Sequence, residues 1–199
     1  MRELVLASGN PRKLREFRAL LSDPDIQVLS QSELGVASPE ETGLTFVENA
    51  LIKARHAAHH TGKPAVADDS GIAVDVLGGR PGIFSARYAG VGASDEENLS
   101  QLLADVRQFS DKQLSCRFVC VLAYLGAADD PLPLICTATW EGRLIRAPRG
   151  ENGFGYDPIF FLDDHGCTSA ELASEVKNEI SHRGQAFRMF HQQFRRFPS

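Results

Sequence analysis

The chain has 199 residues, of which 43% are hydrophobic and 24% charged, and its formal net charge is −5. This composition is typical of a folded globular domain, and it excludes the strongly basic proteins that bind nucleic acid or anionic membranes. The chain has no run of about 18 apolar residues, the length that a membrane-spanning helix needs. The first residues, MRELVLASGN, lack the apolar segment of a signal peptide. We expect a cytoplasmic protein that binds neither nucleic acid nor membrane, with a single two-lobed domain over residues 1–199.

Apolar runs and helical patterns alternate along the first half of the chain. Asn10 and Pro11 are typical of a helix N-cap and a first helical residue, so the segment SGNPRK joins a strand end to a helix start. Thr45 and Glu48 form a capping-box pattern that opens a second helix. The patterns predict strands over residues 3–7, 26–30, 64–68 and 72–76, and helices that begin at residues 11 and 46.

The second half of the chain continues this alternation. Ser94 and Glu97 form another capping box, and residues 114–125 are apolar at nearly every position, which predicts a strand covered on both faces. Glycines indicate structured loops over residues 77–92 and 150–157. We expect further strands over residues 134–140 and 142–145, an apolar run over 158–162, and a last helix from Ser181 that buries Phe187, Phe190, Phe194 and Phe197. The fold class is therefore mixed α/β.

The segment SGNPRK is the first candidate site. A loop between a strand end and a helix start presents free backbone N–H groups at the positive end of the helix dipole, which favours an anion. Lys13 lies in the first turn and can reach back over the loop, while Gly9 permits close approach of the backbone. The chain holds no GxxxxGK[ST] phosphate loop, and a plain capped turn is the alternative.

The stretch AVADDSG is the second candidate site. Strand alternation places Asp68 and Asp69 on opposite faces at the end of a buried strand, before a turn expected at Ser70 and Gly71. Buried carboxylates need hydrogen bonds or opposite charges. Asp69 with Glu40 or Glu41 from the acidic loop PEETG suits Mg²⁺, which takes one or two carboxylates plus water and phosphate oxygens. The alternative is a strand-end turn beside a solvated acidic loop.

Two stretches near the C-terminus are candidates for binding a base. Phe154 lies between two glycines and offers a face to a purine, and Asp157 offers an acceptor to a base N–H. His182 and Arg183 stand at a helix start, where the dipole disfavours cations, so these donors point to a carbonyl oxygen of a ligand. The alternatives are a tight turn with a buried aromatic ring and a surface salt bridge.

Taken in order, these stretches resemble the Ham1/inosine triphosphate pyrophosphatase family of non-canonical purine NTP pyrophosphatases. The resemblance rests on LASGNPRK, EETGLTFVENALIKA, ADDSG, LGGRPGIFSARYAG, GFGYDPIF, Lys177 and SHRGQA, which together span Leu6 to Ala186. Ser8 stands where many members carry Thr, and this departure keeps a hydroxyl. The resemblance implies an elongated mixed β-sheet core with two α/β lobes and a central cleft, assembled as a homodimer. It also implies hydrolysis of ITP, dITP and XTP to the monophosphate and pyrophosphate with Mg²⁺.

The resemblance also implies roles for individual residues. Asp69 is the implied catalytic proton acceptor, and Glu41 and Asp69 are the implied metal ligands, with Glu40 less suited. Asp68 is expected to pair with Lys53 or Lys13. The expected substrate-binding residues are Ser8, Gly9, Asn10, Pro11, Arg12, Lys13, Lys53, Asp68, Ser70, Phe154, Gly155, Tyr156, Asp157, Lys177, His182 and Arg183.

Two other functions compete with this interpretation. The stretch LASGNPRK is also similar to the LAS-x-SPRR opening of Maf-like nucleotide pyrophosphatases, although GFGYDP and SHRGQA argue against that family. A non-catalytic nucleotide sensor would use the same residues without turnover.

Donors from His182 and Arg183 favour a base with an oxygen at position 6, as in hypoxanthine and xanthine, over adenine, which carries an amino group there.

Overall fold

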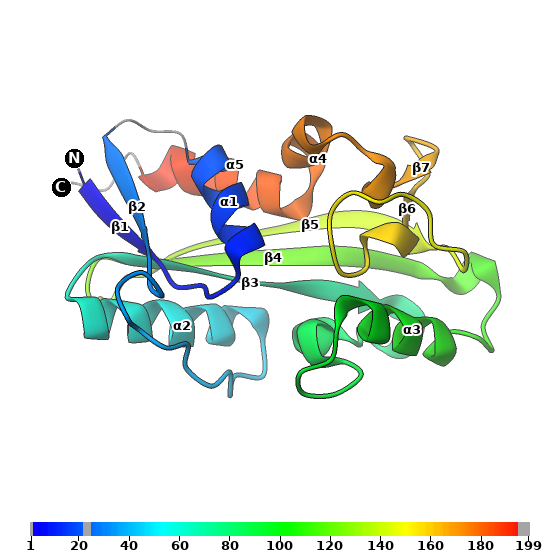
Figure 1. Ribbon diagram of the computed structural model, residues 1–199, viewed down its shortest axis with the longest axis horizontal. Helices are drawn as coiled ribbons and strands as arrows, with labels where there is room; N and C mark the ends of the chain where they lie inside the picture. The colour runs from blue at the N-terminus through cyan, green and yellow to red at the C-terminus, as the bar shows by residue number, and fades with distance from the viewer. Residues whose placement is uncertain (1, 22–24, 195–199) are drawn as a thin grey trace. The chain divides into compact units, whose positions relative to one another are not determined.

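The computed structural model describes residues 2–21 and 25–194, except for the side chains of Arg2 and Arg12. Seven strands form one mixed sheet in the order β2-β1-β3-β4-β5-β6-β7 (Figure 1). The fold class expected from the sequence, mixed α/β, is confirmed. The strands are β1 (Arg2–Leu6), β2 (Ile26–Ser30), β3 (Ala65–Val74), β4 (Ser115–Leu125), β5 (Leu134–Leu144), β6 (Phe160–Leu162) and β7 (Cys167–Thr168). The α-helices are α1 (Pro11–Leu20), α2 (Phe46–Thr61), α3 (Asp95–Asp105), α4 (Ser174–Ile180) and α5 (His182–Phe194).

Helix starts lie where the capping residues predict them. Thr45 is the N-cap of α2, and its hydroxyl accepts a hydrogen bond from the backbone N–H of Glu48 at 3.2 Å. Ser94 and Glu97 form a complete capping box at the start of α3. These local hydrogen bonds satisfy backbone donors that have no partner inside the helix, so they fix each start independently of tertiary packing.

The turn expected at Ser70 and Gly71 is wrong, because β3 continues unbroken from Ala65 to Val74. A Cβ at Gly71 would lie 2.4 Å from the Gly82 carbonyl oxygen and 2.5 Å from the Ser85 hydroxyl oxygen. That hydroxyl instead accepts a hydrogen bond from the Ile72 N–H at 2.9 Å. The glycine therefore marks a close approach of another segment to the strand and not a turn.

The break expected at residue 141 is wrong for the same reason. β5 is continuous through Gly142, where a Cβ would lie 2.7 Å from the ring of Phe160. The short helix α4 was not expected from the sequence. The last helix begins at His182, directly after Ser181, and the expected core position Phe197 lies outside the described residues.

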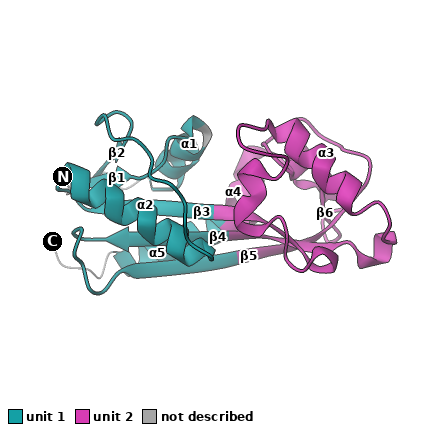
Figure 2. Cartoon of the chain, turned by 90° about the horizontal axis from the view of Figure 1, so that it is seen from below, with its two compact units in different colours: residues 1–69, 120–138, 183–199 teal, residues 70–119, 139–182 magenta. Residues whose placement is uncertain are grey.

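The chain divides into two compact units, and unit 1 comprises residues 1–69, 120–138 and 183–199 (Figure 2). In this unit β1 pairs in parallel with both β2 and β3. Aromatic side chains of α1 and α5 pack on one face of these strands, namely Phe17, Phe187, Phe190 and Phe194. Alanines of α2 pack on the other face, namely Ala54, Ala57 and Ala58. The prediction that Phe187, Phe190 and Phe194 are core residues is confirmed.

Unit 2 comprises residues 70–119 and 139–182 and has its own core. Leu102 of α3 packs there with Ile72, Phe118, Trp140 and Phe160 from the strands. The structured loop expected over residues 77–92 begins at the end of a short 3₁₀ helix, Asp75–Leu77, and contains a second one, Gly82–Arg87. Across residues 2–21 and 25–194, no helix combines the length and apolar character needed to cross a membrane.

The close approach at Gly71 predicts a large stability cost for Gly71→Ala. The added methyl would force the strand away from the segment 82–85, so we expect the free energy of unfolding to fall by about 1–3 kcal/mol. Urea denaturation measures this loss. Gly126→Ala is the control, because a Cβ there would lie no closer than 3.4 Å to its neighbours, and we expect a change within about 0.5 kcal/mol. Equal losses for the two variants would contradict the packing argument.

Candidate functional site

Polar residues of unit 1 gather where β1 ends and its parallel pairing with β3 stops, although β3 itself continues to Val74. Ligands of open α/β sheets bind outside the carboxyl ends of such strands. Ser8 follows β1, and Asp68 and Asp69 lie in β3 just beyond Val66, which pairs with Leu6. The sheet therefore brings the SGNPRK loop and the aspartate pair to the same edge.

The SGNPRK loop is held by its own side chains. The Ser8 hydroxyl accepts from the Asn10 N–H at 3.2 Å, and the Asn10 side-chain oxygen accepts from the Lys13 N–H at 3.4 Å. Asn10 thus caps α1, as the sequence predicted. Gly9 and Pro11 are exposed, and the side chain of Arg12 is not among those described. These bonds shape the start of α1, where backbone N–H groups can face an anion.

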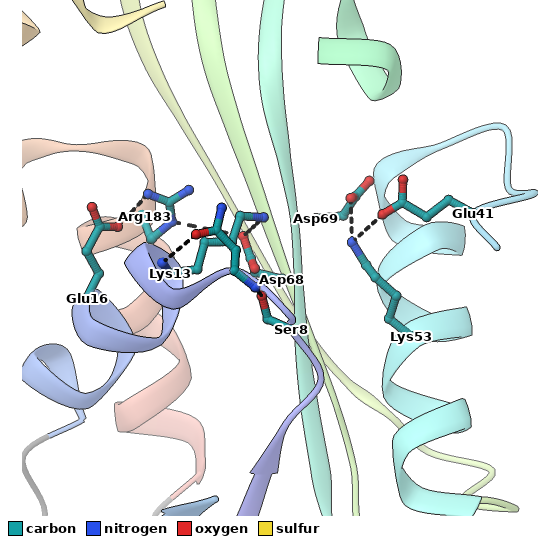
Figure 3. Close-up of polar contacts among 9 residues, drawn as sticks. Ser8, Lys13, Glu16, Glu41, Lys53, Asp68, Asp69 and Arg183 are labelled. Carbon is teal, nitrogen blue, oxygen red and sulfur yellow. Dashed lines mark hydrogen bonds and ion pairs between the residues drawn. The ribbon is translucent and has the colours of Figure 1, made fainter. Parts of the chain in front are cut away.

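Asp68 and Asp69 point to opposite faces of β3, as strand alternation predicted (Figure 3). Asp68 meets Lys13 at 2.8 Å, and the Nε atom of Arg183 lies 4.0 Å from the same carboxylate. Asp69 meets Lys53 of α2 at 2.7 Å on the other face. The two carboxylates are only 4% and 6% exposed, so each depends on its own cation.

These surroundings shift the pKa values of the two carboxylates in opposite directions. Burial alone would raise the pKa of Asp68, but the charges of Lys13, Arg183 and Lys53 outweigh it and hold that pKa well below its usual range. Burial raises the pKa of Asp69, and the charge of Glu41 adds to this effect while Lys53 opposes it. Asp68 is therefore fixed as an anion, and Asp69 is the better proton acceptor.

Glu41 and Asp69, which Lys53 joins through its ammonium group, are the two carboxylates that could bind a metal. The ammonium nitrogen of Lys53 lies 2.9 Å from Glu41 and 2.7 Å from Asp69, so it already joins two carboxylates. The second oxygen of Asp69 is buried and has no hydrogen-bond partner among the described residues. Burial lowers the pKa of Lys53, but the charges of Asp69, Asp68 and Glu41 outweigh this and raise it. Glu40 is exposed.

This donor set suits Mg²⁺ better than a metal held by protein alone. Over the described part of the chain, no cluster of three or more His, Cys, Asp or Glu side chains could hold a metal ion. Two carboxylates with one unsatisfied oxygen match an ion that keeps several waters and completes its shell with substrate phosphates. The rings of His56 and His60 lie 4.3 Å apart between centroids at a tilt of 55°, and the two residues belong to no such cluster among these residues.

In unit 2, Asp157 holds the loop that carries Phe154. Its carboxylate is 3% exposed and accepts from the Phe154 N–H at 2.8 Å, the Ser169 hydroxyl at 2.7 Å and Lys177 at 2.5 Å. A Cβ at Gly153 would lie 2.1 Å from this carboxylate. These contacts hold the loop, and the expectation that Asp157 also accepts a hydrogen bond from a base N–H stays a prediction.

Two neighbours of Phe154 also form hydrogen bonds within unit 2. The hydroxyl of Tyr156 donates to the Ser85 carbonyl at 2.8 Å, and burial raises the pKa of this tyrosine. The N–H of Gly155 donates to Asp95 at 3.1 Å. Both residues therefore position the loop, and Phe154, which is half-buried, remains the candidate for contact with a base.

The structure places His182 and Arg183 in different surroundings. In unit 2 the imidazole of His182 stacks on Phe118 at 4.8 Å between centroids, and the ring of Trp140 lies 6.2 Å away. In unit 1 the guanidinium of Arg183 binds Glu16 at 2.5 Å beside Asp68. Arg183 therefore contacts residues of the aspartate site, and the expectation that both residues read one edge of a base stays a prediction.

Several residues that shape the site were not found from the sequence. Glu16 lies one helical turn after Lys13 on α1, and this spacing was the one available signal. Ser169, Phe118 and Trp140 act through contacts that are distant in the sequence, so no local pattern reveals them. Ser70 is half-buried within β3.

The chain is similar to known proteins over nearly its whole length. The model of the Ham1 family matches residues 4–193. The dITP/XTP pyrophosphatases of Escherichia coli O157:H7 and Pectobacterium atrosepticum are each 57% identical over 189 residues, which cover 95% of this chain and 96% of theirs. A HAM1 protein from Coxiella burnetii has 50% identity and a TM-score of 0.93, with coverage of 99% of this chain and 100% of its own. The Ham1 protein of Staphylococcus aureus has 39% identity and a TM-score of 0.87, with 98% of both chains covered.

The buried pair of Asp157 and Lys177 predicts a stability loss for Lys177→Met. The substitution leaves a buried carboxylate without its cation, so we expect the free energy of unfolding to fall by about 2 kcal/mol or more. Thermal or urea denaturation measures the change. Arg143→Met is the control, because it breaks an exposed pair with Asp163 that contributes at most about 1 kcal/mol. A larger loss for the control would refute this assignment.

Proposed function

Because the chain belongs to the Ham1 family, we propose that it hydrolyses non-canonical purine nucleoside triphosphates, among them dITP, ITP and XTP, to the monophosphate and pyrophosphate. The observation that carries the proposal is that two successive aspartates of β3 have different partners. Asp68 is held as an anion by Lys13 and Arg183, while Asp69 faces Glu41 and Lys53 with one oxygen unsatisfied among the described residues. The cations gathered around Asp68 can face phosphates, and that oxygen of Asp69 can bind a metal ion.

The triphosphate is an anion, whereas the chain carries a net charge of −5. Local cations must therefore compensate it. The backbone N–H groups at the start of α1, with Lys13 beside them, supply positive potential at the SGNPRK loop. Arg183, which pairs with Glu16 and lies beside Asp68, adds a second positive charge near Lys13. We assign Ser8, Asn10 and Lys13 to the phosphates on this basis.

Glu41 and Asp69 would hold Mg²⁺, with water and phosphate oxygens completing its shell. When bound, the ion supplies charge neutralisation for the leaving pyrophosphate and a lower pKa for a bound water. The unsatisfied, buried oxygen of Asp69 supports this assignment. Lys53, which reaches both carboxylates, keeps them close together and limits their mutual repulsion.

Asp69 accepts the proton of the attacking water in this proposal. The water oxygen forms a bond to the α-phosphorus, the bond from that phosphorus to the pyrophosphate oxygen breaks, and the proton passes to the carboxylate. Burial raises the pKa of Asp69 and so makes it a stronger base than an exposed aspartate. Lys53 binds one oxygen of Asp69 at 2.7 Å, and the remaining lone pair of that oxygen can accept the proton of the water while the second oxygen holds the ion.

Unit 2 supplies the groups for the base. Phe154 offers an aromatic face on a loop that Asp157 and Lys177 hold in place. His182 offers an imidazole whose ring plane is fixed by stacking on Phe118. A donor from His182 favours an oxygen at position 6 of the base, and it would be left unpaired opposite the amino group of adenine.

The proposal also includes a homodimer in the cytoplasm, as the resemblance to the family implies. The competing functions, a Maf-like pyrophosphatase and a non-catalytic sensor, are not favoured. The relatives with high identity are dITP/XTP pyrophosphatases, and the similarity covers nearly all of both chains.

A substrate panel tests the proposed function directly. With Mg²⁺ present, we expect kcat/KM for ITP, dITP and XTP to exceed that for ATP by about 100-fold or more, because adenine leaves a donor unpaired. Measuring pyrophosphate and orthophosphate separately identifies the bond that is cleaved, and we expect pyrophosphate. A preference for UTP or dTTP would support the Maf-like alternative, and tight ITP binding without turnover would support the sensor.

The role of Asp69 predicts the effect of Asp69→Asn. The amide cannot accept the proton, so we expect kcat for ITP to fall by about 100-fold or more while calorimetric binding of ITP persists. Asp163→Asn is the control, because Asp163 forms an exposed pair with Arg143. Near-normal turnover by Asp69→Asn would place the base on another residue.

A further inference from the structure

Two buried asparagines occupy equivalent positions at the starts of α2 and α3. Asn49 lies four residues after the N-cap Thr45, and Asn98 lies four residues after the N-cap Ser94. Both side chains are buried, with exposures of 0% and 3%. Each side-chain oxygen accepts a hydrogen bond from the loop before its helix, so the pair provides a comparison within one chain.

Asn98 is fully satisfied by its loop. Its oxygen accepts from the Ala89 N–H at 2.8 Å, and its amide donates to the Ala86 carbonyl at 3.2 Å. An asparagine that uses both ends in this way has a sufficient structural reason for its position. Asn98 is therefore the example of a buried asparagine, four residues after an N-cap, whose hydrogen bonds explain its position through stability alone.

Asn49 is satisfied at one end within the described part of the chain. Its oxygen accepts from the Gly43 N–H at 2.8 Å, but its amide nitrogen is buried without a hydrogen-bond partner among residues 2–21 and 25–194. A buried donor without a partner lowers stability. Stability alone is therefore a poorer explanation for Asn49 than for Asn98.

The loop that Asn49 holds carries a proposed metal ligand. Gly43 lies two residues after Glu41, and a Cβ at Gly43 would lie 2.6 Å from the Cβ of Glu48 and 2.7 Å from the Asn49 oxygen. The loop backbone thus lies directly against the first turn of α2. One turn further along the same helix, Lys53 binds the carboxylate of Glu41 at 2.9 Å. The helix therefore holds this loop at two points, the backbone at Gly43 and the carboxylate of Glu41.

We propose that Asn49 is a positioning residue for the metal-binding carboxylate of Glu41, acting through the backbone of Gly43. This inference rests on the proposed function, because it takes Glu41 as a ligand of Mg²⁺. The lysine contact alone fixes the tip of a flexible side chain, whereas the Asn49 contact fixes the backbone from which that side chain extends. Partners of this kind set the orientation of a ligand, and their loss typically weakens metal binding about 10- to 100-fold.

Asn49→Ala tests the inference through metal affinity. We expect the Mg²⁺ concentration that gives half-maximal ITP hydrolysis to rise about 10-fold, with kcat at saturating Mg²⁺ changed much less. Titration with Mn²⁺ in the presence of a non-hydrolysable ITP analogue, followed by electron paramagnetic resonance of the free ion, should show the same weakening without turnover. Gly43→Ala, which displaces the loop by a clash, should reproduce the effect.

Asn98→Ala is the matched control. It removes two hydrogen bonds, so we expect it to lower the melting temperature more than Asn49→Ala does, and to leave the Mg²⁺ dependence unchanged. A merely structural role for Asn49 predicts the same behaviour for both variants. An unchanged Mn²⁺ affinity in Asn49→Ala would therefore overturn the inference.

Combination with Glu41→Gln separates this inference from the proposed function. If Asn49 acts through Glu41, Asn49→Ala should weaken Mn²⁺ binding in the parent but add nothing in the Glu41→Gln background. If Glu41→Gln leaves metal binding intact, the metal assignment itself fails. If Glu41→Gln weakens binding and Asn49→Ala does not, the inference about Asn49 alone is wrong.

Discussion

Two buried carboxylates on successive residues of one strand cannot share a cation. Alternation sends Asp68 and Asp69 to opposite faces of β3, and each must be neutralised where it emerges. Unit 1 solves this with different helices on its two faces. α1 and α5 bring Lys13 and Arg183 to Asp68, and α2 brings Lys53 to Asp69. The helices that cover the sheet are thus also the source of the charges at its edge.

The two aspartates differ in chemistry because they contact different numbers of cations. Asp68 meets two cations, which make protonation difficult, whereas Asp69 shares one lysine with Glu41. A single residue step along a strand therefore produces one structural anion and one candidate base. A helix could not do this as simply, because successive residues there differ in direction by about a quarter turn.

Local hydrogen bonds explain which parts of the structure the sequence predicted. The caps at Asn10, Thr45 and Ser94 involve residues within a few positions of one another, so their patterns are visible in the chain. The turn expected at Gly71 and the strand break expected just before Gly142 are wrong, because each glycine lies against a neighbour that is distant in the sequence. The partners of Arg183 and Asp157 were missed for the same reason, since Glu16 is 167 positions from Arg183 and Ser169 is 12 from Asp157. Residue types identified the site, but contacts decided the individual roles.

The stacking of Trp140 near His182 has an optical consequence. The chain contains one tryptophan, and its ring lies 6.2 Å from the imidazole of this histidine, at an interplanar angle of 21°. Indole emission from the protein therefore originates entirely beside the side chain proposed to read the base. The unmodified protein carries its own fluorophore at this position, so changes at the imidazole can be followed in stopped-flow experiments without attaching a label.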